Sequence, residues 1–301
     1  MRFHVGETMT PVANLLPLAK AVEGLGYDGY AISDSLFFPK ESDTNYSYGA
    51  DGSRDFLENK PVVESFVLAT AIGATTSLEI TTSVVKLPVR QPVYAAKLAA
   101  SVSAISRGRF NLGVGLSVWP EDYTALGLPY EDRGRRLDEC IDIVRGLTAG
   151  GYFEYHGKYY DFPPIKLNPI PRGALSILVG GHSDVALKRA ARNDGWTCAG
   201  APIDALTQMI AKLKSYRADT GKTGEFRIFE TDIGAVGIDD VRRKQDAGVT
   251  DLIVYFRNIY AVEEDREPLE TKIDRFRRFS DEAIARFPRL PRNSGSRNVD
   301  P

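Results

Sequence analysis

The chain has 301 residues, of which 43% are hydrophobic and 26% are charged, and its formal net charge is -2. This length suits two average domains or one large α/β domain, and the absence of a basic excess argues against nucleic acid as a partner. The N-terminus, MRFHVGETMT, lacks the apolar core of a secretory signal, and no run is long enough to span a bilayer. We therefore expect a cytoplasmic protein with neither a nucleic-acid nor a membrane partner.

Cysteine and histidine are too sparse and too scattered to indicate disulfides or a metal. The two cysteines, Cys140 and Cys198, fall in an expected helix and an expected strand. The three histidines, His4, His156 and His182, are far apart and show no metal-ligand spacing. We expect no disulfide framework and no metal site.

Short apolar runs alternate along the chain with amphipathic helical patterns. The runs typical of buried parallel strands are 3–5, 30–33, 78–85, 110–115, 175–180, 196–200, 229–236 and 251–256. Helical spacing of apolar residues is clearest over 11–26, 92–106, 135–150 and 206–221. This alternation predicts βα units and a parallel sheet.

Eight expected strands over about 250 residues match the size of a (β/α)8 TIM barrel. A doubly wound open sheet is the alternative. We expect one domain over residues 1–288, with a disordered tail at 289–301. Long segments at 35–61, 116–134 and 151–173 exceed the minimum for a barrel, and we expect them to form loops at the C-terminal face of the strands. Within the last, YFEYHGKYYDF predicts a small hairpin that turns at His156-Gly157.

A glycine pair joins a strand to a helix in ILVGGHSDVALKRAARNDGWTCAG, residues 177–200. A helix start after glycines offers backbone N–H groups and the positive end of the helix dipole to a phosphate. Gly180, Gly181, His182 and Ser183 are therefore candidate phosphate contacts. Asp184 could satisfy the same dipole internally, and His182 could be a packing residue, so the turn alone leaves both readings open.

Other candidates follow the ends of expected strands. GVGLSVWPEDY, 113–123, begins Gly-x-Gly but lacks the third glycine of the dinucleotide fingerprint, so its glycines fit either close approach of a flat ligand or a tight strand exit. Glu7 and Asp34 follow the first and second strands, where a barrel places catalytic groups. Each could be an acid or base, or a loop anchor.

Several motifs in order resemble the luciferase-like family of flavin and deazaflavin oxidoreductases. They are SRGRF before FNLGVG, ALGLPYEDRGRRLDE, the YFEYHGKYYDF hairpin and VGGHS before a basic helix, together with TTSVVKLPVRQPVYAAKLAASV and ISD. The resemblance covers about residues 1–285.

The resemblance implies a barrel with the cofactor ring in its mouth and a non-proline cis peptide near the end of the third strand. It implies that the cofactor is held by the strand-end segments, whose residues are Asp34, Thr82, Ser83, Val84, Gly115, Leu116, Gly180, Gly181, His182, Ser183, Ala199, Gly200 and Ala201. Many deazaflavin-dependent relatives have Asp-His at the second strand end, whereas this chain has Asp34-Ser35. Leu116 also stands where some relatives have an acid. Glu7 and Asp34 are the catalytic candidates that remain, with a loop tyrosine as a further possibility.

Chain length and motif subtype favour coenzyme F420 as the cofactor, with hydride transfer to or from a small organic substrate. The alternatives are an FMN-dependent monooxygenase supplied by a separate reductase, a flavin-binding protein without turnover, and a barrel lyase or isomerase acting on a phosphorylated substrate. A homodimer is a possible assembly.

Overall fold

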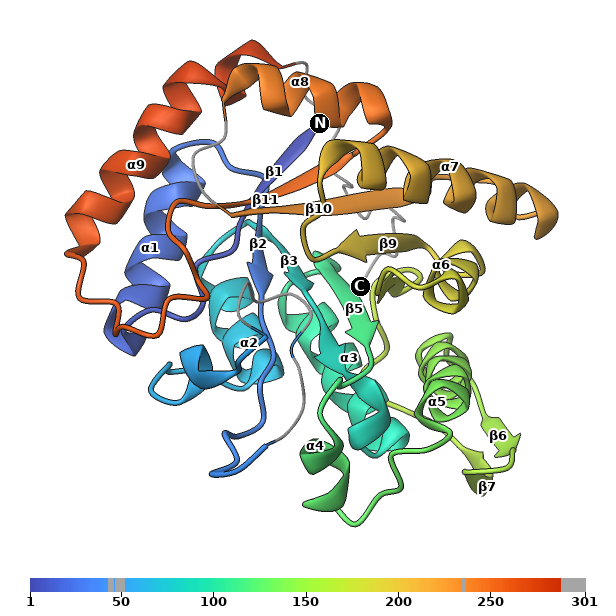
Figure 1. The fold of residues 1–301 in the computed structure, drawn as a ribbon. Helices are drawn as coiled ribbons and strands as arrows, with labels where there is room; N and C mark the ends of the chain where they lie inside the picture. Colours follow the sequence, from blue (N-terminus) through green and yellow to red (C-terminus); the bar gives the residue numbers. More distant parts are fainter. Residues whose placement is uncertain (43–45, 47–51, 234–236, 288–301) are drawn as a thin grey trace.

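Eight parallel strands close into a barrel in the computed structural model, which describes residues 1–42, 46, 52–233 and 237–287. The strands pair in the order β3-β2-β1-β11-β10-β9-β8-β5, and pairing of β3 with β5 closes the circle. Figure 1 shows the strands at the centre of the molecule. They are β1 (Arg2–Val5), β2 (Gly29–Ile32), β3 (Glu79–Thr82), β5 (Phe110–Gly115), β8 (Ser176–Gly180), β9 (Gly195–Cys198), β10 (Arg227–Ile233) and β11 (Asp251–Tyr255).

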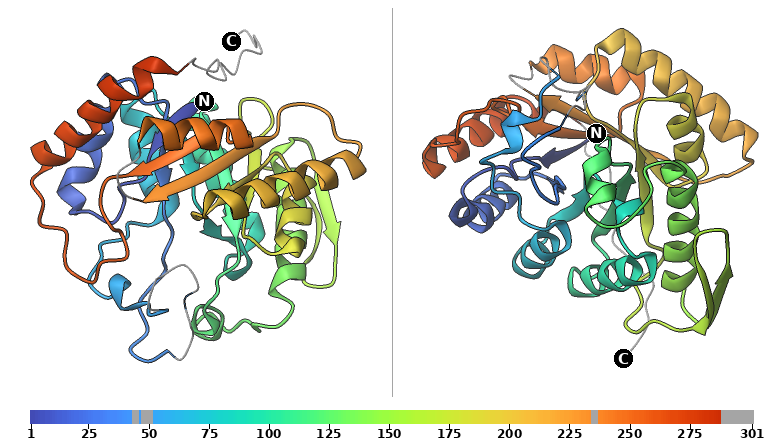
Figure 2. Two further views of the ribbon diagram at one scale, coloured as in Figure 1. Left: turned by 45° about the horizontal axis from the view of Figure 1, so that its top comes forward. Right: turned by 60° about the horizontal axis from the view of Figure 1, so that its bottom comes forward.

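Helices connect successive strands and surround them, as the two views in Figure 2 show. The last helix packs against the first, which completes the outer ring. The closed barrel confirms the (β/α)8 prediction and excludes the open doubly wound sheet. The helices are α1 (Val12–Gly24), α2 (Ser65–Thr75), α3 (Pro92–Ile105), α4 (Pro120–Thr124), α5 (Arg133–Thr148), α6 (Asp184–Ala191), α7 (Ile203–Asp219), α8 (Ile238–Ala247) and α9 (Leu269–Glu282), with 3-10 turns η1 (Asp55–Leu57), η2 (Leu87–Val89) and η3 (Ile284–Arg286).

The third expected strand is divided in two. The segment 78–85 was expected to be continuous, but the chain breaks between β3 and β4 (Val85–Lys86). A cis peptide bond joins Ser83 to Val84 at that break, within the segment where the family resemblance implies one. Thr82 still pairs with Ile32 of β2 in the barrel wall, and Ser83 and Val84 occupy the break.

The predicted hairpin forms outside the barrel from β6 (Phe153–His156) and β7 (Asp161–Ile165), which pair antiparallel. The end of the seventh expected strand, 234–236, and the expected tail, 289–301, lie outside the described residues. Within the described residues, no helix has both the length and the apolarity to cross a bilayer.

Two apolar clusters form the core of the protein. The larger lies between the strands and the helices, as expected for strands whose every second side chain faces outward. The smaller lies inside the barrel, where Ala31, Leu178, Phe229 and Ile253 meet, and it continues to Trp119 in the loop after β5. The barrel is thus a packed core with an aromatic cover at one end.

Candidate functional site

The predicted site residues meet at the C-terminal rim of the barrel. Because all eight strands are parallel, the segments that follow them lie at the same end. The residues follow six different strands: Glu7 after β1, Asp34 after β2, Thr82, Ser83 and Val84 at the end of β3, Gly115 and Leu116 at the end of β5, Gly180, Gly181, His182 and Ser183 after β8, and Ala199, Gly200 and Ala201 after β9. The structure therefore brings to one rim residues that lie up to 194 positions apart in sequence, from Glu7 to Ala201.

The turn after β8 requires glycine and ends in a capped helix. Gly181 has φ +120°, and a Cβ there would lie 2.9 Å from Cβ of Ala186. Ser183 is the N-cap of α6, and its Oγ accepts a hydrogen bond from the Ala186 backbone N–H at 3.3 Å. The first turn of α6 thus directs backbone N–H groups and the positive helix end toward the rim.

Asp184 does not turn back onto this helix start. Its Oδ1 pairs with Lys212 Nζ at 2.8 Å, and its Oδ2 accepts from the Tyr216 hydroxyl at 3.1 Å. Both partners lie on α7, so the carboxylate is directed toward the neighbouring helix. These exposed contacts contribute little to stability. They do pair the negative charge of Asp184, which could otherwise interact with the positive end of the α6 dipole.

His182 links the turns after β8 and β9. Its Nε2 accepts from the Ala199 backbone N–H at 3.3 Å and lies 3.3 Å from Sγ of Cys198. The Trp196 indole N–H donates to the Gly181 carbonyl at 2.8 Å. Burial lowers the pKa of His182, so the ring is neutral at pH 7 and accepts at Nε2. His182 therefore packs between the two turns, which is one of the two roles that the sequence allowed for it.

Glu230 lies beneath the turn after β9. The side chain of this β10 residue is 1% exposed, and its Oε1 accepts from the Ala201 N–H at 3.3 Å. Its Oε2 has no hydrogen-bond partner among the described residues. Burial raises the pKa of Glu230 to about 7, against the lowering effects of Cys198, Lys244 and the Ala201 N–H. Glu230 was not predictable from the sequence, because a glutamate inside an apolar run carries no local signal of function.

Glycines on β5 and β8 make space for the Val84 side chain. A Cβ on Gly115 would lie 2.6 Å from Val84 Cγ2, and one on Gly180 would lie 3.0 Å from Val84 Cγ1. A Cβ on Gly113 would overlap the backbone oxygen of Thr82. Gly113 and Gly115 of β5 therefore allow the chain at and after the end of β3 to approach closely. This role differs from the two that the sequence suggested, which were contact with a flat ligand and a tight exit from the strand.

Asp34 is a buried and fully bonded carboxylate. Arg90 binds it with two hydrogen bonds, at 2.7 and 2.9 Å, and the Lys86 N–H and Ser65 hydroxyl each donate at 2.9 Å. Although burial raises the pKa of Asp34, Arg90 and the backbone N–H of Lys86 outweigh it and lower the pKa. Asp34 is thus ionised and anchors the β4–η2 segment to the end of β2.

Glu7 sits in a second buried cluster on the other side of β1. Its Oε2 accepts from Arg257 Nε at 2.7 Å, and its backbone carbonyl accepts from the Tyr30 hydroxyl at 2.6 Å. Burial raises the pKa of Tyr255, and Glu7 adds to this effect. The ring of Tyr255 fills the space that a side chain on Gly6 would need. The cluster therefore places a carboxylate, a guanidinium and a phenol at one strand end.

An aromatic group covers the barrel mouth. The rings of Tyr46 and Trp119 stack with centroids 5.3 Å apart, and Phe56 and Tyr260 meet edge to face at 5.1 Å. Tyr46 lies in the long segment after β2, and Trp119 lies in the loop after β5.

A charged cluster occupies the opposite, N-terminal end of the barrel. His4, Glu79 and Asp251 place ligand-type atoms within 4.8 Å of one another, although their spacing in sequence gave no such indication. Arg227 hydrogen-bonds both Glu79 and Asp251, and His4 Nε2 lies 2.8 Å from Asp251 Oδ1. Because an arginine already neutralises these carboxylates, the cluster fits an ion-pair network of the barrel floor, the face that serves stability in this fold.

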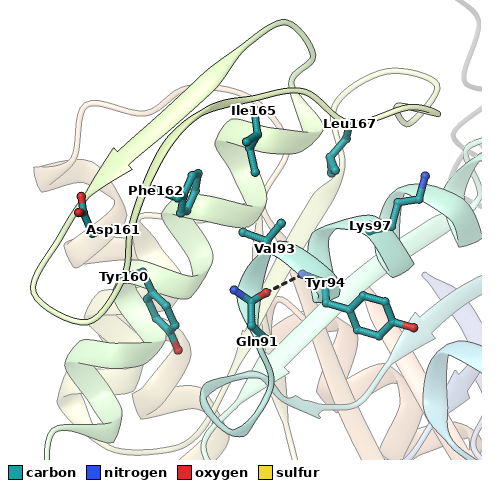
Figure 3. Close-up of a pocket in the computed structure, with 9 residues that line it drawn as sticks. All are labelled: Gln91, Val93, Tyr94, Lys97, Tyr160, Asp161, Phe162, Ile165 and Leu167. Carbon is teal, nitrogen blue, oxygen red and sulfur yellow. Dashed lines mark hydrogen bonds between the residues drawn. The ribbon is translucent and has the colours of Figure 1, made fainter.

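A surface cavity of about 530 Å³ lies outside the barrel, between α3 and the hairpin (Figure 3). Val93 and Ile165 supply apolar walls, and Gln91 accepts a hydrogen bond from the Tyr94 N–H at 2.8 Å. No predicted site residue lines this cavity. Its lining residues are Gln91, Val93, Tyr94, Lys97, Tyr160, Asp161, Phe162, Ile165 and Leu167.

The protein is thus a (β/α)8 barrel that carries strand-end glycines, a helix N-terminus and buried acids at one rim. The sequence pattern of the luciferase-like monooxygenase family matches residues 2–287. The chain belongs to that family, whose members are oxidoreductases or monooxygenases.

Relatives by sequence cover this chain to different extents. An uncharacterized protein of Mycobacterium tuberculosis is 48% identical over 287 residues, which are 95% of this chain and 100% of the relative. The FMNH(2)-dependent dimethylsulfone monooxygenase of Pseudomonas fluorescens is 29% identical over 60% of this chain and 45% of its own length. The chain thus spans about half the length of that monooxygenase.

Solved structures share the fold at low sequence identity. The monooxygenase RslO1 of Streptomyces bottropensis matches with a TM-score of 0.74 at 16% identity, covering 95% of this chain and 99% of that one. An F420-dependent secondary alcohol dehydrogenase in complex with an F420-acetone adduct matches with a TM-score of 0.73 at 14% identity, covering 94% and 98%. At these identities the similarity shows the barrel fold alone.

Proposed function

We propose that this protein is an F420-dependent oxidoreductase that transfers hydride between the deazaflavin and a small organic substrate. The observation that carries the proposal is the joined pair of turns after β8 and β9, where the glycine at 181, the capped start of α6 and the Ala199–Ala201 segment meet through His182. That arrangement suits the cofactor phosphate, because helix N-termini and glycine backbone bind anions. When bound, the deazaflavin supplies the hydride chemistry.

The residues of the rim fit a flat ring as well as a phosphate. Gly115 and Gly180 carry no side chain where β5 and β8 end, and Val84 fills the adjoining space. These residues are proposed to form one wall against the ring, and the aromatic cover at Trp119 is proposed to close over the substrate.

Glu7 is the better of the two candidate acid–base groups. The Asp34 carboxylate is held by four hydrogen bonds and its pKa is lowered, so its role is proposed to be the positioning of Lys86 and Arg90. Glu7 lies beside Tyr255, a buried phenol that is protonated at neutral pH. A proton held by this pair would replace the function of the histidine that Ser35 displaces.

The choice of F420 over FMN rests on motif subtype, because length alone does not separate the two classes. The chain covers 98% of the F420-dependent alcohol dehydrogenase and 99% of the monooxygenase RslO1. Titration of the purified protein with F420, FMN and FAD, followed by cofactor fluorescence, tests the choice. We expect F420 alone to bind tightly, and binding of FMN alone would transfer the assignment to the monooxygenase.

The FMN-dependent monooxygenase remains the second candidate because sequence similarity favours it. The dimethylsulfone monooxygenase is 29% identical over 182 residues, which exceeds the 14% identity to the F420-dependent structure. If FMN binds, reduced FMN with dioxygen should then oxygenate a small organic substrate, whereas F420 should give no turnover.

A substitution at Gly181 tests the phosphate site directly. Asp at this position would place a negative charge against the phosphate, whereas Asn has the same shape without the charge. Both strain the backbone at φ +120°, so both should lower the melting temperature to a similar extent. We expect Gly181→Asp to weaken cofactor binding at least about tenfold more than Gly181→Asn, as a charge effect of about 1.4 kcal/mol requires. Equal affinities of the two variants would place the phosphate elsewhere.

A further inference from the structure

Arg54 is a buried cation in the aromatic cover of the barrel mouth. It precedes η1 in the long segment after β2, and it is 4% exposed. Its guanidinium carbon lies 3.9 Å from the ring centroid of Trp119 and 5.7 Å from that of Phe38. The guanidinium is therefore enclosed by rings that favour a cation but provide no hydrogen-bond acceptor in the ring plane.

The guanidinium lacks the hydrogen bonds that burial demands. Its Nε, Nη1 and Nη2 atoms are all buried, and none has a hydrogen-bond partner in the described part of the chain. Glu121 Oε2 lies 3.7 Å from Nη1, which is close enough for an ion pair but too far for a hydrogen bond. Since an arginine carries five N–H donors and natural proteins pair nearly all buried polar groups, this set of donors calls for an acceptor.

Asp122, one of the two carboxylates beside Arg54, is already bound to another cation. Asp122 Oδ2 accepts from Lys86 Nζ at 2.7 Å and from the Ser117 hydroxyl at 2.5 Å. Burial lowers the pKa of Arg54, and the charges of Asp122 and Glu121 oppose this only in part.

Donors outnumber acceptors around this arginine. The nearby acceptor atoms that lack a hydrogen-bond partner are Oε2 of Glu121 and Oδ1 of Asp122. The Trp119 indole N–H is a further donor without a hydrogen-bond partner, in addition to those of Arg54. Two oxygens cannot satisfy six N–H groups. The balance would be restored by a ligand that brings two or three acceptor oxygens and a negative charge.

We propose that Arg54 binds an oxyanion, a carboxylate or a sulfonate, at one end of the substrate. Trp119 belongs to the cluster that lines the barrel interior with Phe229 and Ile253, so a ligand at Arg54 would extend its apolar body toward the proposed ring site. The substrate class is thus a small organic anion with an apolar body. This inference rests on the proposed function in that it takes the reacting group to lie in the barrel mouth.

Hexanoate and hexanamide are a matched pair of test ligands, because they differ mainly in charge. Their binding to the F420-loaded protein and to the cofactor-free protein would be measured by isothermal titration calorimetry. We expect hexanoate to bind at least about tenfold more tightly than hexanamide, and Arg54→Gln to remove that difference. Equal binding of the two ligands, or binding of neither, would overturn the proposal.

Two further variants separate ligand binding from support of the loop. Arg54→Lys keeps the charge without the planar fork, and should recover part of the preference for hexanoate. Glu121→Gln removes the competing carboxylate and should strengthen hexanoate binding. If Glu121→Gln instead weakens hexanoate as much as Arg54→Gln does, the two residues act by holding the loop together and the proposal fails.

The cofactor titration distinguishes this inference from the proposed function. The F420 affinity of Arg54→Gln should equal that of the unmodified protein, since the phosphate site lies after β8 and β9. A loss of F420 affinity in Arg54→Gln would assign the anion to the cofactor and overturn the substrate assignment. Failure of F420 to bind the unmodified protein, with an Arg54-dependent hexanoate preference in the cofactor-free protein, would reject the proposed function and retain the oxyanion site.

Discussion

Glu230 shows how burial of one residue creates a group that titrates near neutral pH. The carboxyl is enclosed by Cys198 on β9, Lys244 on α8 and the turn that carries Ala201, and Asp232 lies on its own strand. Lys244 pairs with Asp232, so it does not fully neutralise Glu230. Burial therefore outweighs the favourable contacts and raises the pKa to about 7 from an ordinary value of 4.5.

Glu230 should make the folded state less stable as the pH rises. The folded protein binds its proton up to about pH 7, whereas the unfolded chain releases it near pH 4.5, so stability falls across that window by on the order of 3 kcal/mol and is then constant. Glu230→Gln mimics the protonated acid and should remove this loss. Urea unfolding at pH 5 and pH 8 would measure it, with Glu58→Gln on an exposed residue as the control. The same pH dependence in Glu230→Gln and the unmodified protein would contradict the expectation.

Among the secondary-structure elements, β5 contains glycines because neighbouring segments pack closely against it. Its burial pattern and length are those of any central strand, yet Gly113 and Gly115 face the chain that follows β3. Glycine is unfavourable inside a strand unless another backbone or side chain needs the space. The contacts of Thr82 and Val84 provide that reason.

Gly115→Ala should destabilise the protein and weaken cofactor binding together. The added Cβ would lie 2.6 Å from Val84 Cγ2, so Val84 must move, and overpacking of this kind costs about 1–3 kcal/mol. Gly24→Ala at the end of α1 is the matched control, because a Cβ there meets nothing within 4 Å. Thermal unfolding and cofactor titration of both variants would test this. A stable Gly115→Ala protein with unchanged affinity would show that Val84 does not form the wall.

At the scale of the molecule, the two ends of the barrel have separate tasks. The N-terminal end holds the ion-pair network of Arg227, Glu79, Asp251 and His4, in which Asp251 has a strongly lowered pKa because Arg227 and His4 outweigh its burial. The C-terminal end holds the proposed site. A substitution at the N-terminal end should therefore alter stability without altering the proposed site.

Arg227→Met should lower the free energy of unfolding by about 3–5 kcal/mol, because it leaves Asp251 and Glu79 as buried charges without their main partner. Cofactor affinity at low temperature should not change. Denaturant unfolding and cofactor titration of the same preparation would check both statements. A large loss of affinity in a folded Arg227→Met protein would show that the two ends are coupled.

Local sequence patterns determined the architecture of this protein. Apolar runs and helical spacing located all eight barrel strands, because burial on both faces of a parallel strand leaves a continuous apolar run. The hairpin at His156-Gly157 was likewise predicted from alternation and a turn. The break between β3 and β4 was not predictable from the apolar run alone, because the residues on both sides of it pair with β5, which is distant in sequence.

The candidate site was predictable in position but not in chemistry. Residues after strand ends must meet at one rim of a parallel barrel, so Glu7, Asp34 and the Gly180–Ser183 turn could be placed from the sequence. Their partners could not, because Arg90 is 56 residues from Asp34 and Arg257 is 250 residues from Glu7. Whether a carboxylate is a base or an anchor depends on such partners and on burial. Sequence patterns therefore locate the barrel and its rim, whereas long-range packing establishes which acids are bound, which are buried, and which cation lacks an acceptor.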